Sequence, residues 1–309
     1  MLDPAGTGAE RVAGLTWLLF AIGGALVVLF VVLVLWAAAR RRSPDVQVKH
    51  GGRGVVLVAG LAIPAAILTV VYGIGLQDMR ALQKPAKDAS LTIDVIGHIW
   101  WWEVRYPGQS GSDGGDVVTA NEIHVPTGKV VHVRLTTADV NHSFWVPQLM
   151  PKTDLVAGRV NDTWLQATKD GTYRGRCAEY CGLQHANMHF LVVAEPEQQF
   201  QQWLDQQEQP AGEPLNALQR QGKQVFENAS CASCHTMRGT TAHGDVGPDL
   251  THLASRQEIG AGAAPNTRGY LSGWIANSQT LKPGNKMPPQ PLSPEDLKAL
   301  VAYLEAGKP

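Results

Sequence analysis

Residues 177–188 read CAEYCGLQHANM. This stretch is rich in side chains that bind metals, and the fold of the surrounding chain must place them together. Its soft ligand atoms are two thiols, one imidazole and one thioether, in Cys177, Cys181, His185 and Met188. Such groups suit copper, zinc or an iron–sulfur cluster. A blue copper site needs only one cysteine, whereas two bridging thiolates can hold two copper ions, each of which needs a histidine. The stretch therefore predicts most of the ligands of a metal site, and a pair of copper ions would need a second histidine from another part of the chain.

The second histidine must come from elsewhere in the chain, and His142, in the segment NHSFWVP, is the best candidate. Three other histidines, His98, His124 and His132, fall inside alternating strand patterns, so we expect them to lie on the faces of a sheet. His189 opens a further strand next to the cluster. The predicted metal site thus joins two segments that are distant in sequence.

The other two cysteines, Cys231 and Cys234, stand in the sequence CASCH, which His235 completes. This C-x-x-C-H pattern is typical of covalent c-type haem attachment, in which two thioethers hold the porphyrin and the histidine ligates the iron. A thioredoxin-like redox pair would need a βαβ context, whereas the flanks here are helical in pattern. Two structural disulfides are the plain alternative, because both cysteine pairs are expected on an oxidising side of a membrane.

The sixth ligand of a haem iron must come from farther along the chain, because Met237 is too close to His235 to reach the opposite face. His243 and His252 are possible ligands. We favour Met287, in the sequence KMPP before the last helical segment, since a thioether opposite histidine raises the potential and suits electron transfer. Its ordinary alternative is to fill the core.

The segment that contains the first cysteine pair has the pattern of a β protein. Runs rich in Val, Ile, Thr and aromatic residues alternate with Gly, Pro and Asp clusters, at 91–106, 129–137, 163–168 and 189–194. Short strands at this spacing predict a sandwich or a Greek-key barrel over residues 88–196.

The segment that contains the second pair is helical in pattern. Residues 197–214 are rich first in Gln and then in Pro and Gly, which favours a short helix and a linker. Residues 215–309 follow as an all-α domain. In its last helix, apolar side chains recur on one face, at Leu297, Leu300, Val301 and Leu304. Ser293 is expected to cap that helix.

Two apolar windows precede both domains. Residues 12–39 and 54–77 contain no charged side chain, and each is long enough to span a bilayer. We expect spans at about 14–39 and 54–77, within an N-terminal unit of residues 1–87 that ends in a connector. Pro64 should kink the second span. Neither window contains an ionisable side chain, so the hairpin is expected to be an anchor rather than an ion path.

Basic residues set the orientation of this hairpin. They concentrate between the spans, at Arg40, Arg41, Arg42, Lys49 and Arg53. Only Arg11 precedes the first span. Because Lys and Arg gather on the cytoplasmic side, both termini and residues 79–309 are expected outside. A signal peptide cleaved at the alanines of 37–39 is the alternative, but its positive charges should precede a shorter apolar core.

The composition limits the function classes further. The chain has 309 residues and a formal net charge of −1, so a basic field for nucleic acid is excluded. Two spans exclude a many-span transporter and a purely cytosolic protein. The sequence therefore predicts a multi-domain membrane protein with a two-helix transmembrane hairpin, a β-sandwich domain and an all-α domain.

Residues 215–309 resemble class I cytochrome c. The resemblance rests on Gly222 and Phe226, the CASCH motif, the Gly247–Pro248 pair, Met287 and the last helix. In that family the carbonyl of the proline accepts the N–H of the proximal histidine. This role maps onto Pro248 and His235, and it agrees with how outer ligand contacts orient a histidine.

The chain up to about residue 195 resembles cytochrome c oxidase subunit II. The matching segments are GHIWWW at 97–102, HSFWVP at 142–147, KTD at 152–154, GR at 158–159 and the cluster at 177–188. The resemblance implies a cupredoxin-like fold for the β domain. With the haem segment, the whole chain resembles the variant in which subunit II is fused to cytochrome c.

This resemblance implies a dinuclear CuA centre. Its ligands map onto His142, Cys177, the backbone carbonyl of Glu179, Cys181, His185 and Met188. By the same resemblance, the Glu179 carboxylate helps to bind magnesium at the boundary with subunit I, which is plausible chemistry for a hard cation. The family also passes electrons to CuA through the first tryptophan of the aromatic run, Trp100, which strand alternation places on one face with Trp102.

The implied function is electron transfer within a cytochrome c oxidase, a translocase and oxidoreductase. Electrons from an external donor, either a cytochrome c or a bc-type complex, would pass from haem c to CuA and then to haem in subunit I. That partner would reduce O2 to water and pump protons. Subunit III is a further expected partner, and the bacterial plasma membrane, with the soluble domains on the periplasmic side, is the expected location.

Three other functions are compatible with parts of this pattern. A nitric oxide reductase with CuA would use the same electron path. A stand-alone membrane-tethered carrier or copper-delivery protein would lack an oxidase partner. A quinol oxidase subunit II would lack copper, and the intact Cys, His and Met set argues against it.

Overall fold

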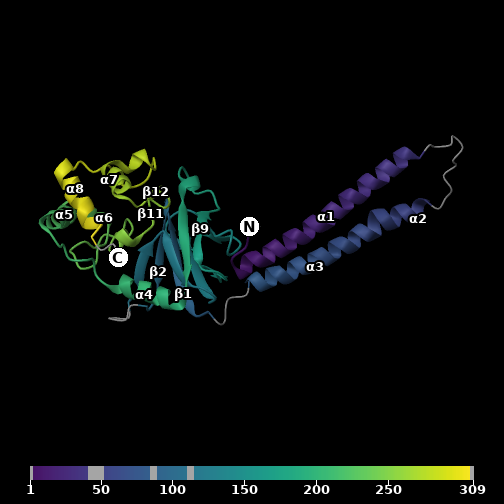
Figure 1. Cartoon of the computed structure of the whole chain (residues 1–309), viewed down its shortest axis with the longest axis horizontal. Coiled ribbons are helices and arrows are strands. Elements are labelled where there is room, and N and C mark those ends of the chain that lie inside the picture. Colours follow the sequence, from purple (N-terminus) through teal and green to yellow (C-terminus); the bar gives the residue numbers. More distant parts are fainter. Residues whose placement is uncertain (1–2, 41–51, 84–88, 110–114, 307–309) are drawn as a thin grey trace.

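The computed structural model describes residues 3–40, 52–83, 89–109 and 115–306. Of the basic residues between the spans, Arg41, Arg42 and Lys49 lie outside the described residues, as does part of the expected connector, at 84–88. Figure 1 shows three regions in a row: a long helical hairpin, a β domain in the centre and a helical domain at the opposite end.

The hairpin consists of two long helices that lie side by side (Figure 1). The first is α1 (Thr7–Ala39), and the second runs without a break through α2 (Gly52–Leu57), η1 (Val58–Ala62) and α3 (Ile63–Gln83). Each helix has an apolar window of 18 residues with no residue buried inside the structure, and both helices are long enough to cross a membrane. Their exposed apolar surface is what a bilayer would cover.

The second helix accommodates Pro64 by a change in its hydrogen bonding. A proline inside a helix has no N–H for the preceding turn. Here η1 is a π-helical turn directly before the proline, and the N–H of Ile63 donates to the carbonyl of Val58, five residues earlier. The expected disturbance at Pro64 therefore takes the form of a π turn within a continuous helix.

The β domain is a sandwich of two five-stranded sheets. The first has the order β3 (Val117–Ala120), β2 (Trp101–Tyr106), β1 (Leu91–His98), β5 (Val131–Thr137) and β8 (Asn161–Leu165). The second has the order β4 (Glu122–Pro126), β10 (His189–Glu195), β9 (Gly171–Cys177), β6 (His142–Trp145) and β7 (Thr153–Leu155). Side chains from both sheets form one buried core, among them Val104, Phe144 and Phe190. The predicted sandwich is confirmed.

The aromatic run departs from the sequence expectation. The strand pattern over 91–106 divides into β1 and β2, which pair as an antiparallel hairpin in which His98 lies opposite Trp101. Trp100 therefore lies in the turn. The prediction from strand alternation, that Trp100 and Trp102 share one face of a strand, is wrong. Trp102 is fully buried in the core, whereas Trp100 is only partly buried. Because of the turn, Trp102 belongs to the core of the sandwich, whereas Trp100 packs against the edge of that core.

The C-terminal domain is helical, with its own core. Its longer helices are α5 (Ala217–Asn228), α7 (Arg268–Asn277) and α8 (Pro294–Leu304), and α6 (Cys231–Cys234) is a single turn. Phe226, Leu300 and Tyr303 are buried where α5 packs against α8. Ser293 caps α8 as expected, because its hydroxyl accepts the N–H of Asp296.

Several shorter elements complete the chain. The helix α4 (Glu197–Glu208) lies on the β domain, against β3 and β4, and precedes the crossing to the helical domain. The others are the 3-10 turns η2 (His185–Asn187), η3 (Leu253–Ser255) and η4 (Ser278–Thr280), and the two-residue strands β11 (Glu258–Ile259) and β12 (Ala264–Pro265).

Candidate metal centres

The fold brings the soft ligands of the two predicted segments together at one end of the sandwich. Cys177 ends β9, His142 opens β6, and Cys181, His185 and Met188 follow in the loop that leads to β10. The Cys177 and Cys181 sulfurs lie 3.8 Å apart. Cys177 lies 3.8 Å from His142 Nδ1, and Cys181 lies 3.6 Å from His185 Nδ1. Each thiol therefore has one imidazole beside it, as two bridged copper ions require.

Two weaker ligands complete this cluster. The Met188 sulfur lies 3.8 Å from the Cys181 sulfur, and the Glu179 carbonyl lies 3.1 Å from the Cys177 sulfur. A disulfide would bring the two sulfurs to about 2 Å, so the cysteines are free thiols that face one another. The set of donors, soft sulfur and imidazole with one carbonyl, fits copper.

Most ligands of the cluster are buried, and His185 is partly buried. His142 and Met188 are completely buried, and Cys177 and Cys181 are each 5% exposed. His142 fits because Gly97 on β1 faces its ring: a Cβ at residue 97 would lie 2.7 Å from His142 Cδ2. A glycine is therefore required where the backbone approaches the ring so closely.

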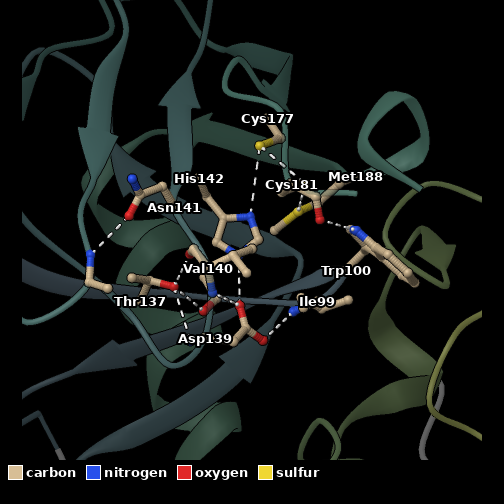
Figure 2. A network of polar contacts seen from close by, with 12 residues as sticks. Ile99, Trp100, Thr137, Asp139, Val140, Asn141, His142, Cys177, Cys181 and Met188 are labelled. Atoms are coloured by element: carbon tan, nitrogen blue, oxygen red, sulfur yellow. Dashed lines mark hydrogen bonds and ion pairs between the residues drawn. The ribbon is translucent and has the colours of Figure 1, made fainter. Parts of the chain in front are cut away.

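Asp139 fixes the orientation of His142 (Figure 2). Its Oδ1 accepts hydrogen bonds from His142 Nε2 at 2.9 Å and from the Val140 N–H at 2.8 Å, and its Oδ2 accepts from the Ile99 N–H at 2.7 Å. Burial raises the pKa of Asp139, but these bonds outweigh it and hold the pKa below its usual value. The carboxylate leaves Nδ1 of His142 as the ring nitrogen that faces the thiols. The sequence analysis missed this residue.

The pKa values of the two thiols are shifted in opposite directions. The hydrogen bond from Cys181 lowers the pKa of Cys177, and the bond to His142 and nearby N–H groups act in the same direction against burial. The same contact raises the pKa of Cys181. A cation that binds both sulfurs would displace the proton from each thiol.

The Glu179 side chain points away from this cluster. It is 47% exposed, and its nearest charged partner is Lys152, at 4.0 Å. Tyr180 and Leu183, on the same loop, are also largely exposed. The loop therefore presents a carboxylate and apolar side chains on the outer surface, while its sulfur and imidazole ligands point inward.

A second candidate site lies in the helical domain. A large, mostly apolar cavity is lined by Cys231, Cys234 and His235 and also by Met287. His243, His252 and Met237 are absent from its lining among the described residues. His252 instead bonds the Gln209 carbonyl, at 2.9 Å. The cavity thus brings together the predicted haem attachment residues and the favoured axial pair.

His235 is held as an axial ligand must be. Its Nδ1 donates to the Pro248 carbonyl at 2.8 Å, which leaves Nε2 free for a metal. A Cβ at Gly247 would lie 2.5 Å from His235 Cε1, so only glycine allows the chain to pass the ring. Burial lowers the pKa of His235, which keeps the imidazole neutral and able to ligate.

Arg256 is a further residue that the sequence analysis missed. Its guanidinium is buried and lines the cavity. It donates to the Asp249 carbonyl at 2.6 Å, but its Nε has no partner among the described residues. A buried cation with an unused donor suits the carboxylate of a bound haem. This cavity therefore fits haem in its attachment groups, its axial pair and its charge.

Trp100 connects the two sites. Its indole N–H donates to the Cys181 carbonyl at 2.8 Å (Figure 2), and Trp100 also lines the cavity of the helical domain. Ile99 and Trp101 line the same cavity from the β domain. The cavity is thus closed by both domains, and a single aromatic side chain touches both the cysteine loop and the cavity wall.

Three other histidines bond carboxylates of the β domain. His98 stacks on Trp101 and bonds Glu103, and His132 bonds Asp162, both on sheet faces as expected. His124 was also expected on a face, but it is only 8% exposed because helix α4 covers it.

Comparison with known families separates the chain into the same two parts. The family described as cytochrome c oxidase subunit II, periplasmic domain, matches residues 112–195. The cytochrome c family matches residues 219–308. The copper-type and haem-type sites therefore each lie within a segment that matches a family known for that chemistry.

Relatives match over most of the chain. Cytochrome c oxidase subunit 2 of Alkalihalophilus pseudofirmus is 34% identical over 92% of this chain and 82% of its own length. The subunit 2 of Bacillus subtilis is 28% identical over 99% and 91%. The crystal structure of the periplasmic domain of subunit II from Bradyrhizobium japonicum covers 38% of this chain and 92% of its own, at 33% identity and a TM-score of 0.35. The chain belongs to the cytochrome c oxidase subunit 2 family and carries a cytochrome c domain at its C-terminal end.

Proposed function

We propose that this chain receives electrons at a covalently bound haem c and delivers them through a CuA centre to subunit I of its oxidase, where O2 is reduced to water with proton pumping. As a member of this family it is a subunit of an oxidoreductase complex that includes subunit I. The observation that supports the internal path is Trp100, which contacts both the cysteine loop and the cavity of the cytochrome domain.

We assign the copper ligands as His142, Cys177, the Glu179 carbonyl, Cys181, His185 and Met188. We assign Cys231 and Cys234 as the haem attachment residues, His235 and Met287 as the axial pair, and Pro248 as the acceptor that orients His235. When bound, each group would take up and release one electron at fixed ligands. The donor distances and the free thiols support the first set, and the cavity lining supports the second.

The protein's own contribution is to hold these ligands still and to exclude water. Asp139 and Pro248 each fix one histidine ring by a hydrogen bond to the nitrogen that does not face the site. Four of the proposed copper ligands, His142, Cys177, Cys181 and Met188, are buried, and His185 is partly buried. A dry surrounding of fixed groups limits solvent rearrangement when charge changes, and it tunes the potential of a metal.

The outer surface of the cysteine loop is the proposed contact with subunit I. Tyr180 and Leu183 expose apolar surface, and the exposed Glu179 carboxylate belongs to the same loop. We propose that this carboxylate helps to hold magnesium at that boundary, as an oxygen ligand of a hard cation. Subunit III and an external cytochrome c or bc-type donor are further proposed partners.

We propose that residues 1–87 anchor the chain in a bacterial plasma membrane, with both soluble domains on the periplasmic side. The two exposed apolar helices and the concentration of basic residues between them support this orientation. Residues 88–196 would form the copper domain, 197–214 the linker and 215–309 the cytochrome domain. The separate cores of the two soluble domains support this division.

The function is tested on the purified complex that contains the full chain. Haem c is reduced by a light pulse from a photoreductant, and absorbance is followed at the haem band and at the near-infrared copper band. We expect oxidation of the haem and reduction of the copper with the same time course, followed by oxygen consumption. Reduction of nitric oxide without oxygen consumption, or the absence of a copper phase, would contradict the proposal.

A further inference from the structure

A buried lysine lies at the junction of the two soluble domains. Lys282, in the loop between η4 and α8, is only 2% exposed. Its ammonium donates to three backbone carbonyls: Trp100 at 2.8 Å, Asn187 at 2.8 Å and Gly260 at 2.7 Å. A lysine ammonium has three donors, so all of them are used.

These three carbonyls belong to three different segments. Trp100 lies in the turn between β1 and β2, Asn187 directly precedes the proposed copper ligand Met188, and Gly260 belongs to the cytochrome domain. Removing a charged group from water is costly unless it is fully hydrogen-bonded, and burial lowers the pKa of Lys282 to about 7. A single side chain therefore holds the tryptophan turn, the copper loop and the cytochrome domain at one point.

The loop that carries Lys282 also carries the proposed axial ligand Met287. The carbonyl of Lys282 accepts a bond from the Asn285 side chain at 2.7 Å, and Asn285 in turn accepts the N–H of Met287 at 2.8 Å. The next residue after the lysine, Pro283, accepts a bond at 2.7 Å from Gln184 of the copper loop. The two ligand-bearing loops are thus directly connected.

Hydrogen bonds hold both the side chain and the backbone of Trp100. Its indole N–H donates to the Cys181 carbonyl, and its own carbonyl accepts from Lys282. Without the ammonium, the three carbonyls would lose this hydrogen-bond partner. Water would then enter between the domains, and the indole would lose its fixed place against the cytochrome cavity.

We infer that Lys282 is a positioning residue for electron transfer between the two metal centres, which it sets at a fixed separation by joining their ligand loops. The inference rests on the proposed function. In the step that it serves, one electron is lost by haem c and gained by the copper pair, and no bond forms or breaks. Lys282 lines the cavity but is not a proposed ligand of either centre, so it acts through Trp100 and the two loops.

The test compares Lys282→Met with the wild-type chain in the purified, metal-loaded complex. Methionine has nearly the same volume but no donor for the carbonyls. After pulsed reduction of haem c, we expect electron transfer to copper to slow by about tenfold or more, as for other small displacements of reacting groups. The thioether–iron band and the near-infrared copper band should stay unchanged.

Lys298→Met is the matched control, because Lys298 lies exposed on α8 of the same domain and the substitution removes the same charge. It should transfer electrons at the wild-type rate. If Lys282→Met does not accumulate, Lys282→Arg replaces it, since a planar guanidinium cannot direct its donors to three carbonyls around one point. It should also slow transfer while both bands persist.

Two results would overturn the inference. One is transfer at the wild-type rate in the Lys282 variant that accumulates. The other is slow transfer together with loss of either metal band, since the lysine would then support a ligand set rather than the separation. If the wild-type chain itself shows no transfer from haem to copper, the proposed function fails, and this result is distinct from both.

Discussion

At the scale of single residues, the two candidate centres use the same arrangement. Each has a histidine whose outer ring nitrogen donates to a fixed oxygen, and each has a glycine packed against that ring. Gly97 faces His142, and Gly247 faces His235. A side chain at either glycine would displace a ligand ring without touching a metal.

Replacing Cys181 by Ser should remove the copper centre and leave the haem. Cys181 is the sulfur that contacts Cys177, His185 and Met188, and a serine oxygen is a poor ligand for a mixed-valence copper pair. We expect the near-infrared band and the mixed-valence EPR signal to disappear while the haem c spectrum stays intact. Persistence of both copper signals would show that the ligand assignment is wrong.

Replacing Met287 by Ala should leave the haem attached but lower its potential. A thioether opposite histidine raises the potential of a haem iron. The thioether–iron absorption band should disappear, and a potentiometric titration should show the lower midpoint. Met237→Ala is the control, because Met237 is buried in the same domain without lining the cavity. An unchanged band in the Met287 variant would redirect the assignment to His243 or His252.

Replacing Asp139 by Ala should weaken copper binding by about 10-fold to 100-fold, the usual effect of removing a carboxylate that orients a histidine ligand. The reason is that His142 loses the partner of its Nε2. Competition with a copper chelator would measure the affinity. Asp162→Ala removes a comparable partner from His132, far from the site, and should have no effect. Equal affinity in both variants would contradict the role of Asp139.

At the scale of elements, the sequence predicted well what depends on local periodicity. The last helix with its Ser293 cap and the sandwich follow from apolar spacing and turn residues. Short strands such as Val117–Ala120 and Thr153–Leu155 were missed, because three or four residues are too few to show alternation. The division of 91–106 into two strands was missed because its turn consists of Ile99 and Trp100, which are not typical turn residues.

Helix α4 is attached to the sandwich by a buried histidine. His124 bonds Glu195 at 2.8 Å through Nδ1 and Glu122 at 3.1 Å through Nε2, and it stacks on Trp203 of α4. Glu122 also accepts the N–H of Gln257 from the cytochrome domain, at 3.0 Å. Burial alone lowers the pKa of His124, but the two carboxylates outweigh it and raise the pKa above its usual value.

The contribution of His124 to the stability of the β domain should therefore fall as pH rises. A histidine with a raised folded-state pKa stabilises fully below its unfolded pKa of about 6.5, and this contribution is lost as pH passes through the folded-state value. We expect the difference in Tm between the wild-type chain and His124→Gln to be largest in mild acid and to shrink in alkali. A difference that is constant with pH would contradict a protonated His124.

At the scale of the whole molecule, the sequence indicated the three regions and the chemistry of each soluble domain. It gave no sign of how the domains meet. Lys282 and Arg256 are charged residues on an expected helical surface, and nothing local marks either as buried. Their burial depends on partners more than 100 residues away in the chain, such as Trp100 and Thr119, which only the folded structure brings near.

The hairpin is joined to the sandwich at both of its outer ends. Before α1, the N–H of Ala5 donates to Gln148, and its carbonyl accepts from Thr168. At the end of α3, the carbonyl of Leu82 accepts the indole N–H of Trp164, at 3.0 Å. Two attachment points, unlike a single tether, resist swivelling, so the copper ligands would stand at a set height over the lipid. In the proposed membrane orientation, an electron donor would reach the cytochrome domain, which lies at the end of the molecule opposite to the hairpin (Figure 1).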